Sequence, residues 1–239
     1  MKCVISQPTF LPWIGWFDLT DQADIMVILD DVAFSKQSWQ QRNRIRTPNG
    51  LEFLSLPVKT AGKLGQKISD CELANQIFVN KMLKTIHSNY VKAPFYANTI
   101  NELTSIMQNP ANTDRLVELN CALIKWFLYK LQITTPIIFA SKLNANGDRG
   151  EHVASICEQV EANYYLSPAG AEDYLIEDIK AFDDKNISVW LHEYMHPEYR
   201  QRFEPFIPYA STLDLIFNTG HDAYEIMLSG RRPSRPLKR

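Results

Sequence analysis

The sequence predicts an α/β protein in which a mainly parallel sheet is flanked by helices. Two short apolar runs, at residues 2–6 and 25–30, enclose a stretch with helical spacing. A strand, a helix and a strand in such close succession form a unit whose two strands are parallel. The same alternation returns over residues 136–194, where it again predicts parallel strands joined by right-handed crossovers.

The first region begins with a buried strand. Residues 2–6 show no polar alternation, as expected for a strand covered on both faces, and two prolines follow it. Apolar side chains then recur near helical spacing from Trp13 and Trp16 onward, which predicts a short helix over 13–21. The run at 25–30 is a second strand of the same buried kind.

A hairpin is predicted after a loop or irregular helix at residues 36–46. Thr47-Pro48-Asn49-Gly50 is a turn signal, because Asn-Gly accepts positive φ at low cost. Its flanks, residues 44–46 and 51–58, supply the two strands. The following loop, 59–67, is basic, and it is either a lid over an anion or a solvated connection.

The middle of the chain, about 74–131, is predicted to be an inserted helical section. Helices are expected at 74–90 and 96–108, followed by a long helix from Asn112 or Thr113 to about residue 131. The apolar positions of the long helix recur every three or four residues, which is typical of a helix that faces a core. This section carries little chemistry and should support the sheet.

The C-terminal half returns to alternating elements. Asp148 and Glu151 show the spacing of a capping box at the start of a helix. The other expected elements are strands at 136–141, 163–167 and 187–194, a helix at 174–182, and closing helices at 211–218 and 223–228.

Length and charge suggest one α/β domain over residues 1–228 and a basic tail over 229–239. The tail holds five basic residues and no acid, and it is expected to be a flexible, solvated end, although it could contact phosphate or an anionic surface. The body shows no basic stripe, so nucleic acid is not expected as the main ligand.

Compartment is suggested by three features of the composition. No apolar run approaches the roughly 20 residues that span a bilayer, and the N-terminus lacks the pattern of a signal peptide. The four cysteines lie far apart without metal-type spacing. We therefore expect a cytoplasmic protein without a membrane span.

A first cluster of candidate site residues follows the two N-terminal strands. Asp30 and Asp31 end a buried strand, where a carboxylate can hold a metal, accept a proton or bind a sugar hydroxyl. Arginines in the next segment offer planar forks for phosphate or carboxylate. The alternatives are a core role for the tryptophans and a helix cap for an aspartate. The candidate binding residues are Gln7, Trp13, Trp16, Lys36, Trp39, Arg42, Asn43 and Arg44.

A second cluster follows the last predicted strand. On a strand, residues 192, 194 and 196 point to one face, so His192, Tyr194 and His196 should lie together. Either histidine could be a general acid or base, or a structural residue; a zinc site would need a third ligand of obvious spacing. Tyr199 and Ser167 complete the candidates, but no Gly-x-Ser-x-Gly, Walker or Gly-x-Gly-x-x-Gly motif occurs.

Several motifs together resemble the signature of the WbqC-like family. The resemblance rests on residues 7–17, 28–32 and 36–45 in the first half, and on Tyr165-Leu166-Ser167-Pro168, residues 192–199 and residues 211–220 in the second. It implies an association with bacterial surface-polysaccharide (O-antigen) loci, and the transfer of an acyl or aminoacyl group onto an amino sugar. A more distant similarity is to nucleotidylyltransferases, in which His-x-Gly-His stands where this chain has Trp13-Ile14-Gly15-Trp16.

The leading hypothesis is therefore a transferase acting on a nucleotide-linked amino sugar. The arginines, and Lys36 with them, would hold phosphate, Asp30 or Asp31 would bind hydroxyls or an amine, and His192 or His196 would take the proton of the attacking amine. The alternatives are an adenylate-forming or nucleotidyl-transferring enzyme that uses a nucleoside triphosphate with Mg²⁺, and a non-catalytic module that binds a glycan or protein. No metal ligand is assigned and the cofactor stays open. The hypothesis requires the two clusters to line one hollow.

Overall fold

A six-stranded sheet forms the centre of the computed structural model, which describes residues 1–238. Its order is β5 (Ile137–Phe139), β2 (Ile25–Ile28), β1 (Lys2–Ser6), β6 (Tyr164–Pro168), β7 (Ser188–His192) and β8 (Arg235–Pro236). The first five are parallel, and β8 is antiparallel to β7. The predicted mainly parallel α/β fold is confirmed. Numbered along the chain, the parallel strands are arranged 3-2-1-4-5.

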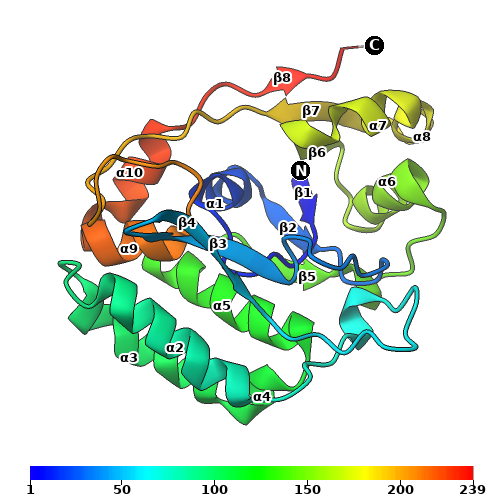
Figure 1. Cartoon of the computed structure of the whole chain (residues 1–239). Coiled ribbons are helices and arrows are strands. Elements are labelled where there is room, and N and C mark those ends of the chain that lie inside the picture. The colour runs from blue at the N-terminus through cyan, green and yellow to red at the C-terminus, as the bar shows by residue number, and fades with distance from the viewer. Residues whose placement is uncertain (239) are drawn as a thin grey trace.

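Helices cover both faces of this sheet (Figure 1). One face carries α1 (Ile14–Asp21), α5 (Leu116–Lys130) and α9 (Thr212–Thr219), and the other carries α6 (Arg149–Gln159), α7 (Glu172–Glu177) and α8 (Ile179–Asp183). Neighbouring residues of one strand enter different cores, because successive side chains point to opposite faces. Val4 packs with the first group and Ile5 with the second, which explains why β1 reads as a continuous apolar run.

The inserted helical section lies on the face of the sheet that carries α1 and α9 (Figure 1). It consists of α2 (Ile77–Tyr90), α3 (Tyr96–Gln108), α4 (Pro110–Thr113) and α5. The expected long helix begins later than predicted, because Asn109 caps the single turn α4 through the backbone N–H of Ala111 and the chain bends before Leu116. The apolar stripe of α5 is buried as expected.

The hairpin forms β3 (Arg42–Thr47) and β4 (Gly50–Ser55), with Gly50 at φ +116° in the turn. The basic loop that follows is tied to the segment after β2, through a bridge between Ala33 and Lys67. Lys59 and Lys63 form ion pairs with Glu72, so the acid within the same region neutralises part of the loop's charge.

Three local predictions are wrong in detail. The helix expected at residues 174–182 is two short helices, α7 and α8, which are separated at Asp178. Asp148 is the N-cap of α6, but its side chain makes no capping bond; the carboxylate at this helix end comes from Asp178, which accepts from Gly150 N at 3.0 Å. The last predicted strand is shorter than expected, because β7 ends at His192 and Tyr194 forms only an isolated bridge with Arg231.

The C-terminal segment differs from the expected solvated end. After α10 (Ala223–Ser229), β8 pairs with β7 along the upper edge in Figure 1. Arg231 forms ion pairs with Asp18 and Asp21, and Arg235 pairs with Glu172 and Glu193, so acids on distant elements hold two of its arginines. Arg239 lies outside the described residues. Short 3-10 turns complete the fold at Ile68–Asp70, Ala140–Lys142, Ala169–Ala171 and Gly220–Asp222. Over residues 1–238, no helix is long and apolar enough to cross a membrane.

Candidate functional site

The strand order places a switch point between β1 and β6. From β1 the chain crosses through α1 to β2 on one side, and from β6 it crosses through α7 and α8 to β7 on the other side. In open α/β sheets, ligands bind outside the carboxyl ends of the strands at such a point. Two adjoining hollows lie there on the α1 face.

We call these hollows the arginine hollow and the histidine hollow. The arginine hollow, of about 220 Å³, is lined by Thr9, Trp13, Trp16, Trp39, Asn43, Arg44 and Tyr209. The histidine hollow, of about 250 Å³, is lined by Trp13, Gly15, Trp16, Leu19, Pro168, Ala169, Gly170, His192, Glu193 and Tyr194. Trp13 and Trp16 line both, so the two indoles form the partition between them.

Each indole of the partition is fixed by its neighbours. Trp16 is buried and donates through Nε1 to Ser6 Oγ at 3.0 Å. The ring of Trp13 lies directly on Gly15, where a Cβ would stand 2.2 Å from the ring, so position 15 has no room for a side chain. Trp13 also meets Tyr194 and Tyr209 edge-on, at centroid distances of 5.6 and 5.4 Å. The spacing Trp-x-Gly-Trp is thus explained by packing.

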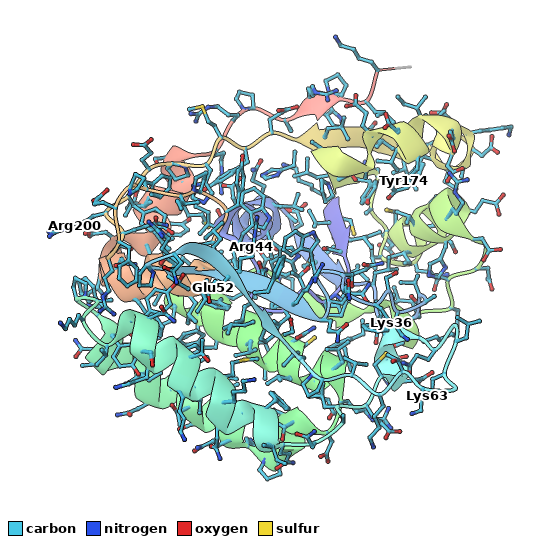
Figure 2. The ribbon with its side chains drawn as sticks, viewed as in Figure 1. Lys36, Arg44, Glu52, Lys63, Tyr174 and Arg200 are labelled. Carbon is cyan, nitrogen blue, oxygen red and sulfur yellow. The ribbon has the colours of Figure 1, made fainter. Side chains whose placement is uncertain are left out.

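The arginine hollow contains a cation without a counter-ion. Arg44 lies between the β3–β4 hairpin and α1 (Figure 2), and its Cζ is 5.4 Å from the ring centre of Trp39. Its Nε is buried without a hydrogen-bond partner, and no carboxylate of residues 1–238 pairs with its guanidinium. Trp39 and Tyr209 are about half exposed. The hollow can therefore take an anionic group beside a planar ring.

The histidine hollow contains an imidazole backed by a carboxylate. His192 Nε2 lies 2.7 Å from Oδ2 of Asp18, which is fully buried. The other oxygen, Oδ1, accepts from Arg231 Nε at 2.7 Å, and Gln22 Nε2 donates to Oδ2 at 2.8 Å. Nδ1 of His192 has no hydrogen-bond partner among the described residues. A histidine held in this way can take up a proton from a substrate.

The other polar side chains of this hollow have fixed partners. Tyr194 donates to Met227 O at 2.8 Å, and burial, followed by the charge of Asp18, raises the pKa of Tyr194 so that its hydroxyl stays neutral. Glu193 Oε1 accepts from Arg235 Nε at 2.7 Å and remains partly exposed. The hollow therefore offers carboxylate and imidazole groups but no free cation among its lining residues.

His196 takes a different place from His192, because β7 ends before it. Its ring stacks on Trp13, with centroids 6.1 Å apart and planes at 16°, and it also packs on Tyr199 and Tyr209. Burial lowers the pKa of His196, so the neutral ring is favoured. His196 therefore packs against the ring of Trp13 and lines neither hollow.

The predicted carboxylates lie outside both hollows. Asp30 is buried and accepts from Ser141 N at 2.9 Å and from Ser141 Oγ at 2.7 Å, which ties the end of β2 to the segment after β5. Asp31 turns to a separate hollow, where its Oδ2 lies 3.0 Å from Nε2 of His152. Asp30 therefore bonds to the backbone of the turn at residues 140–142 from a distant part of the chain, and the N-cap residue of that turn is Phe139.

The remaining candidates are mostly structural in this geometry. The Cζ atom of Arg42 lies 4.4 Å from the ring centre of Phe53. Lys36 is exposed and lies well away from Arg44 in Figure 2. Of the further candidates, Gln7 accepts from Gln40 at 2.7 Å, Asn43 donates to Phe10 O and Leu11 O, Ser167 is buried, and Tyr199 donates to Asp214.

The structure therefore brings together only part of each predicted cluster. Arg44 and His192 lie on either side of the Trp13–Trp16 partition, in two adjoining hollows and not in the single hollow that was expected, and Arg42 and His196 line neither. Asp18 and Arg231 were missed. A sequence signal for Asp18 exists, because it is the one acid inside the otherwise uncharged stretch 13–20. Within the described part of the chain, no group of three or more His, Cys, Asp or Glu residues could hold a metal ion.

Fold and site together define an α/β protein with a 3-2-1-4-5 parallel sheet and a two-part site at its switch point. A family model described as the WbqC-like protein family matches residues 7–226, and the chain belongs to this family. The chain is also similar to a protein of Mycobacterium tuberculosis named "Uncharacterized protein Rv1507c". The two are 31% identical over 223 residues, which cover 93% of this chain and 95% of that protein. No solved structure matches.

Proposed function

We propose that this protein is a cytoplasmic transferase of bacterial surface-polysaccharide biosynthesis that moves an acyl or aminoacyl group onto the amine of a nucleotide-linked amino sugar. The main support for this proposal is the pair of adjoining hollows, one of which offers a cation and the other a candidate proton acceptor. One holds an unneutralised guanidinium among aromatic rings, and the other holds a carboxylate-backed imidazole. The surface-polysaccharide context comes from the family resemblance, and the four unpaired, buried cysteines support a reducing compartment.

The arginine hollow suits the nucleotide end of such a substrate. A guanidinium binds phosphate oxygens in a planar, two-pronged manner, and the exposed face of Trp39 can stack on a base. Sites for drug-sized ligands measure roughly 300–1,000 Å³. Each hollow alone is smaller, at about 220 and 250 Å³, so a nucleotide sugar would occupy both.

The histidine hollow suits the amine. An ammonium has no lone pair, so it must release one proton to solvent before it can attack. The neutral amine then loses a second proton as its nitrogen bonds to the acyl carbon. In the proposed step that proton moves to Nδ1 of His192, and the leaving group of the acyl donor departs with the bonding electrons. Glu193, at the rim of the same hollow, can attract the amine before reaction.

A thermal-shift screen tests this proposal. Amino-bearing nucleotide sugars should raise the melting temperature of the wild type, since a ligand stabilises the folded state in proportion to the logarithm of its excess over Kd. Arg44→Ala should weaken binding about 10–100-fold, the cost of losing a hydrogen-bonded ion pair.

The matched control is Arg42→Ala, two residues along the same strand, because Arg42 stacks on Phe53 and lines neither hollow. It should bind as the wild type does. The panel also contains nucleotides, amino acids, acyl thioesters, and ATP with Mg²⁺. Stabilisation by ATP with Mg²⁺ and by no nucleotide sugar would overturn the proposal in favour of an adenylate-forming or nucleotidyl-transferring enzyme. Binding without turnover of any donor would favour a binding module.

A further inference from the structure

We infer that Asp18 and Arg231 are positioning residues that keep the proton of neutral His192 on Nε2, so that Nδ1 carries the lone pair that faces substrate. Neither residue was among the candidates from the sequence. The role of Nδ1 in turnover rests on the proposed function, whereas the state of the ring does not. The inference follows from which atoms touch and from what each can donate.

The carboxylate of Asp18 can only accept hydrogen bonds. It is fully buried, and its Oδ2 lies 2.7 Å from His192 Nε2. An ionised carboxylate has no proton to give, so Nε2 of the imidazole must be the donor. A neutral imidazole carries one N–H only, and Nδ1 is then the acceptor. His192 lines the histidine hollow, and no described residue occupies Nδ1.

Arg231 gives the Asp18 carboxylate a charged partner and fixes its orientation. A buried carboxylate is costly without a charged partner, and Arg231 supplies one through Nε to Oδ1 at 2.7 Å. Burial acts to lower the pKa of Arg231, but its hydrogen bonds to Asp21 and Asp18 outweigh this and the net shift is upward, so the guanidinium stays charged. Because Arg231 holds Oδ1, Oδ2 is left for His192.

The C-terminal segment is thereby part of the site. Arg231 is placed by the pairing of β8 with β7, and by Arg232 N, which donates to Glu193 O at 3.2 Å. Gly230 lies against Tyr194, where a Cβ would stand 2.5 Å from the ring, so the segment can approach this closely only with glycine there. The basic end of the chain therefore serves His192 and is not only a solvated tail.

Asp18→Asn tests the inference, because Arg231 dictates how an amide would sit. A guanidinium only donates, so the asparagine oxygen must face Arg231 and its NH₂ must face His192. Gln22, whose NH₂ donates to Oδ2 in the wild type, would then turn its own amide oxygen toward this NH₂. Nε2 would then accept, and the proton would move to Nδ1. Nitrogen-15 NMR of the histidine ring, assigned by the loss of signals in His192→Gln, reports which nitrogen is protonated. We expect Nε2 in the wild type and Nδ1 in Asp18→Asn, with turnover lowered by at most the roughly 10²–10⁴-fold loss expected when the base itself is removed.

A second change should reverse the first. In Asp18→Asn combined with Arg231→Met, the amide is free to turn its oxygen toward His192, so Nε2 should regain the proton and turnover should recover at least tenfold over Asp18→Asn alone. Two purely structural residues would instead give additive losses. Arg232→Gln is the matched control, because this neighbouring arginine has no contact with Asp18, and it should leave the ring unchanged.

The outcomes separate this inference from the proposed function. A wild-type ring protonated on Nδ1, or an Asp18→Asn ring still protonated on Nε2, overturns the positioning role, and the wild-type measurement stands even if a variant does not fold. The expected ring states without turnover of any amino sugar would support the positioning role while contradicting the proposed transferase.

Discussion

Two fully buried aspartates, Asp18 in α1 and Asp214 in α9, show how similar burial can serve different ends. Each accepts three hydrogen bonds from other side chains. The donors to Asp18 are an arginine, an imidazole and an amide. The donors to Asp214 are two phenols and an amide, from Tyr90, Tyr199 and Gln201.

Asp18 and Asp214 differ in the residues that they contact and in whether one of those residues borders a hollow. Asp214 joins α9 to α2 and to the segment around Tyr199, deep in the core; burial raises its pKa, against the hydrogen bonds that it receives. Burial likewise raises the pKa of both tyrosines, so they remain neutral donors. Asp18 has a cation on one side and, on the other, a histidine that borders a hollow. A buried carboxylate therefore points to a site only when one of its partners reaches a ligand.

The largest expected effect is on the Asp18 side. His192→Gln removes the proposed base, and turnover should fall by about 10²–10⁴-fold, the usual contribution of a positioned general base. The melting temperature should stay within a few degrees of wild type, because glutamine can still donate to Asp18. Initial rates and calorimetry on the same preparation check both. Retained turnover would show that His192, the partner of Asp18, is not the base.

The next effect is on stability and belongs to Asp214. Asp214→Ala leaves the hydroxyls of Tyr90 and Tyr199 and the amide of Gln201 without this acceptor, and each buried unsatisfied group costs about 1–3 kcal/mol. We expect a loss of at least about 3 kcal/mol in urea unfolding, with turnover per folded molecule unchanged. Asp184→Ala is the control, because its exposed carboxylate pairs with Lys180 one helical turn away and with no other residue of the described range 1–238, and it should lose under about 0.5 kcal/mol. A wild-type stability in Asp214→Ala would contradict the structural role.

The smallest effect concerns pH. The folded-state pKa of Asp214 is raised, so the unfolded state releases this proton more readily than the folded one does. The contribution of Asp214 to stability is therefore full below its unfolded pKa and is lost as pH rises through its folded pKa. Relative to Asp214→Asn, the wild type should gain stability as pH falls from 7 toward 4, measured by urea midpoints. Parallel pH profiles for the two proteins would exclude a raised pKa.

Much of the fold was predictable because it depends on local patterns. The apolar runs of β1 and β2, the helical spacing after Trp13 and the Asn-Gly turn each determine their element within a few residues. The errors at α4 and at the end of β7 concern the boundaries of elements. A single helix cap or a single missing strand-to-strand hydrogen bond decides where such an element begins or ends.

The site was predictable only in part, since its decisive contacts are long-range. The indoles and Arg44 stand in one dense motif, which pattern alone could find. Asp18 meets His192 across 174 positions and Arg231 across 213, and nothing in the spacing of residues indicates such pairs. The basic tail suggested a solvated end for the same reason, because the acids that hold it lie on α1, α7 and the end of β7.

The short strand β8 has one more consequence. By pairing with β7 it makes the edge strand of the sheet two residues long instead of five, and β5 at the opposite margin is three residues long. Long bare margins recruit strands from other molecules, which leads to aggregation. We therefore expect residues 235–236 to reduce strand pairing between neighbouring copies at high concentration.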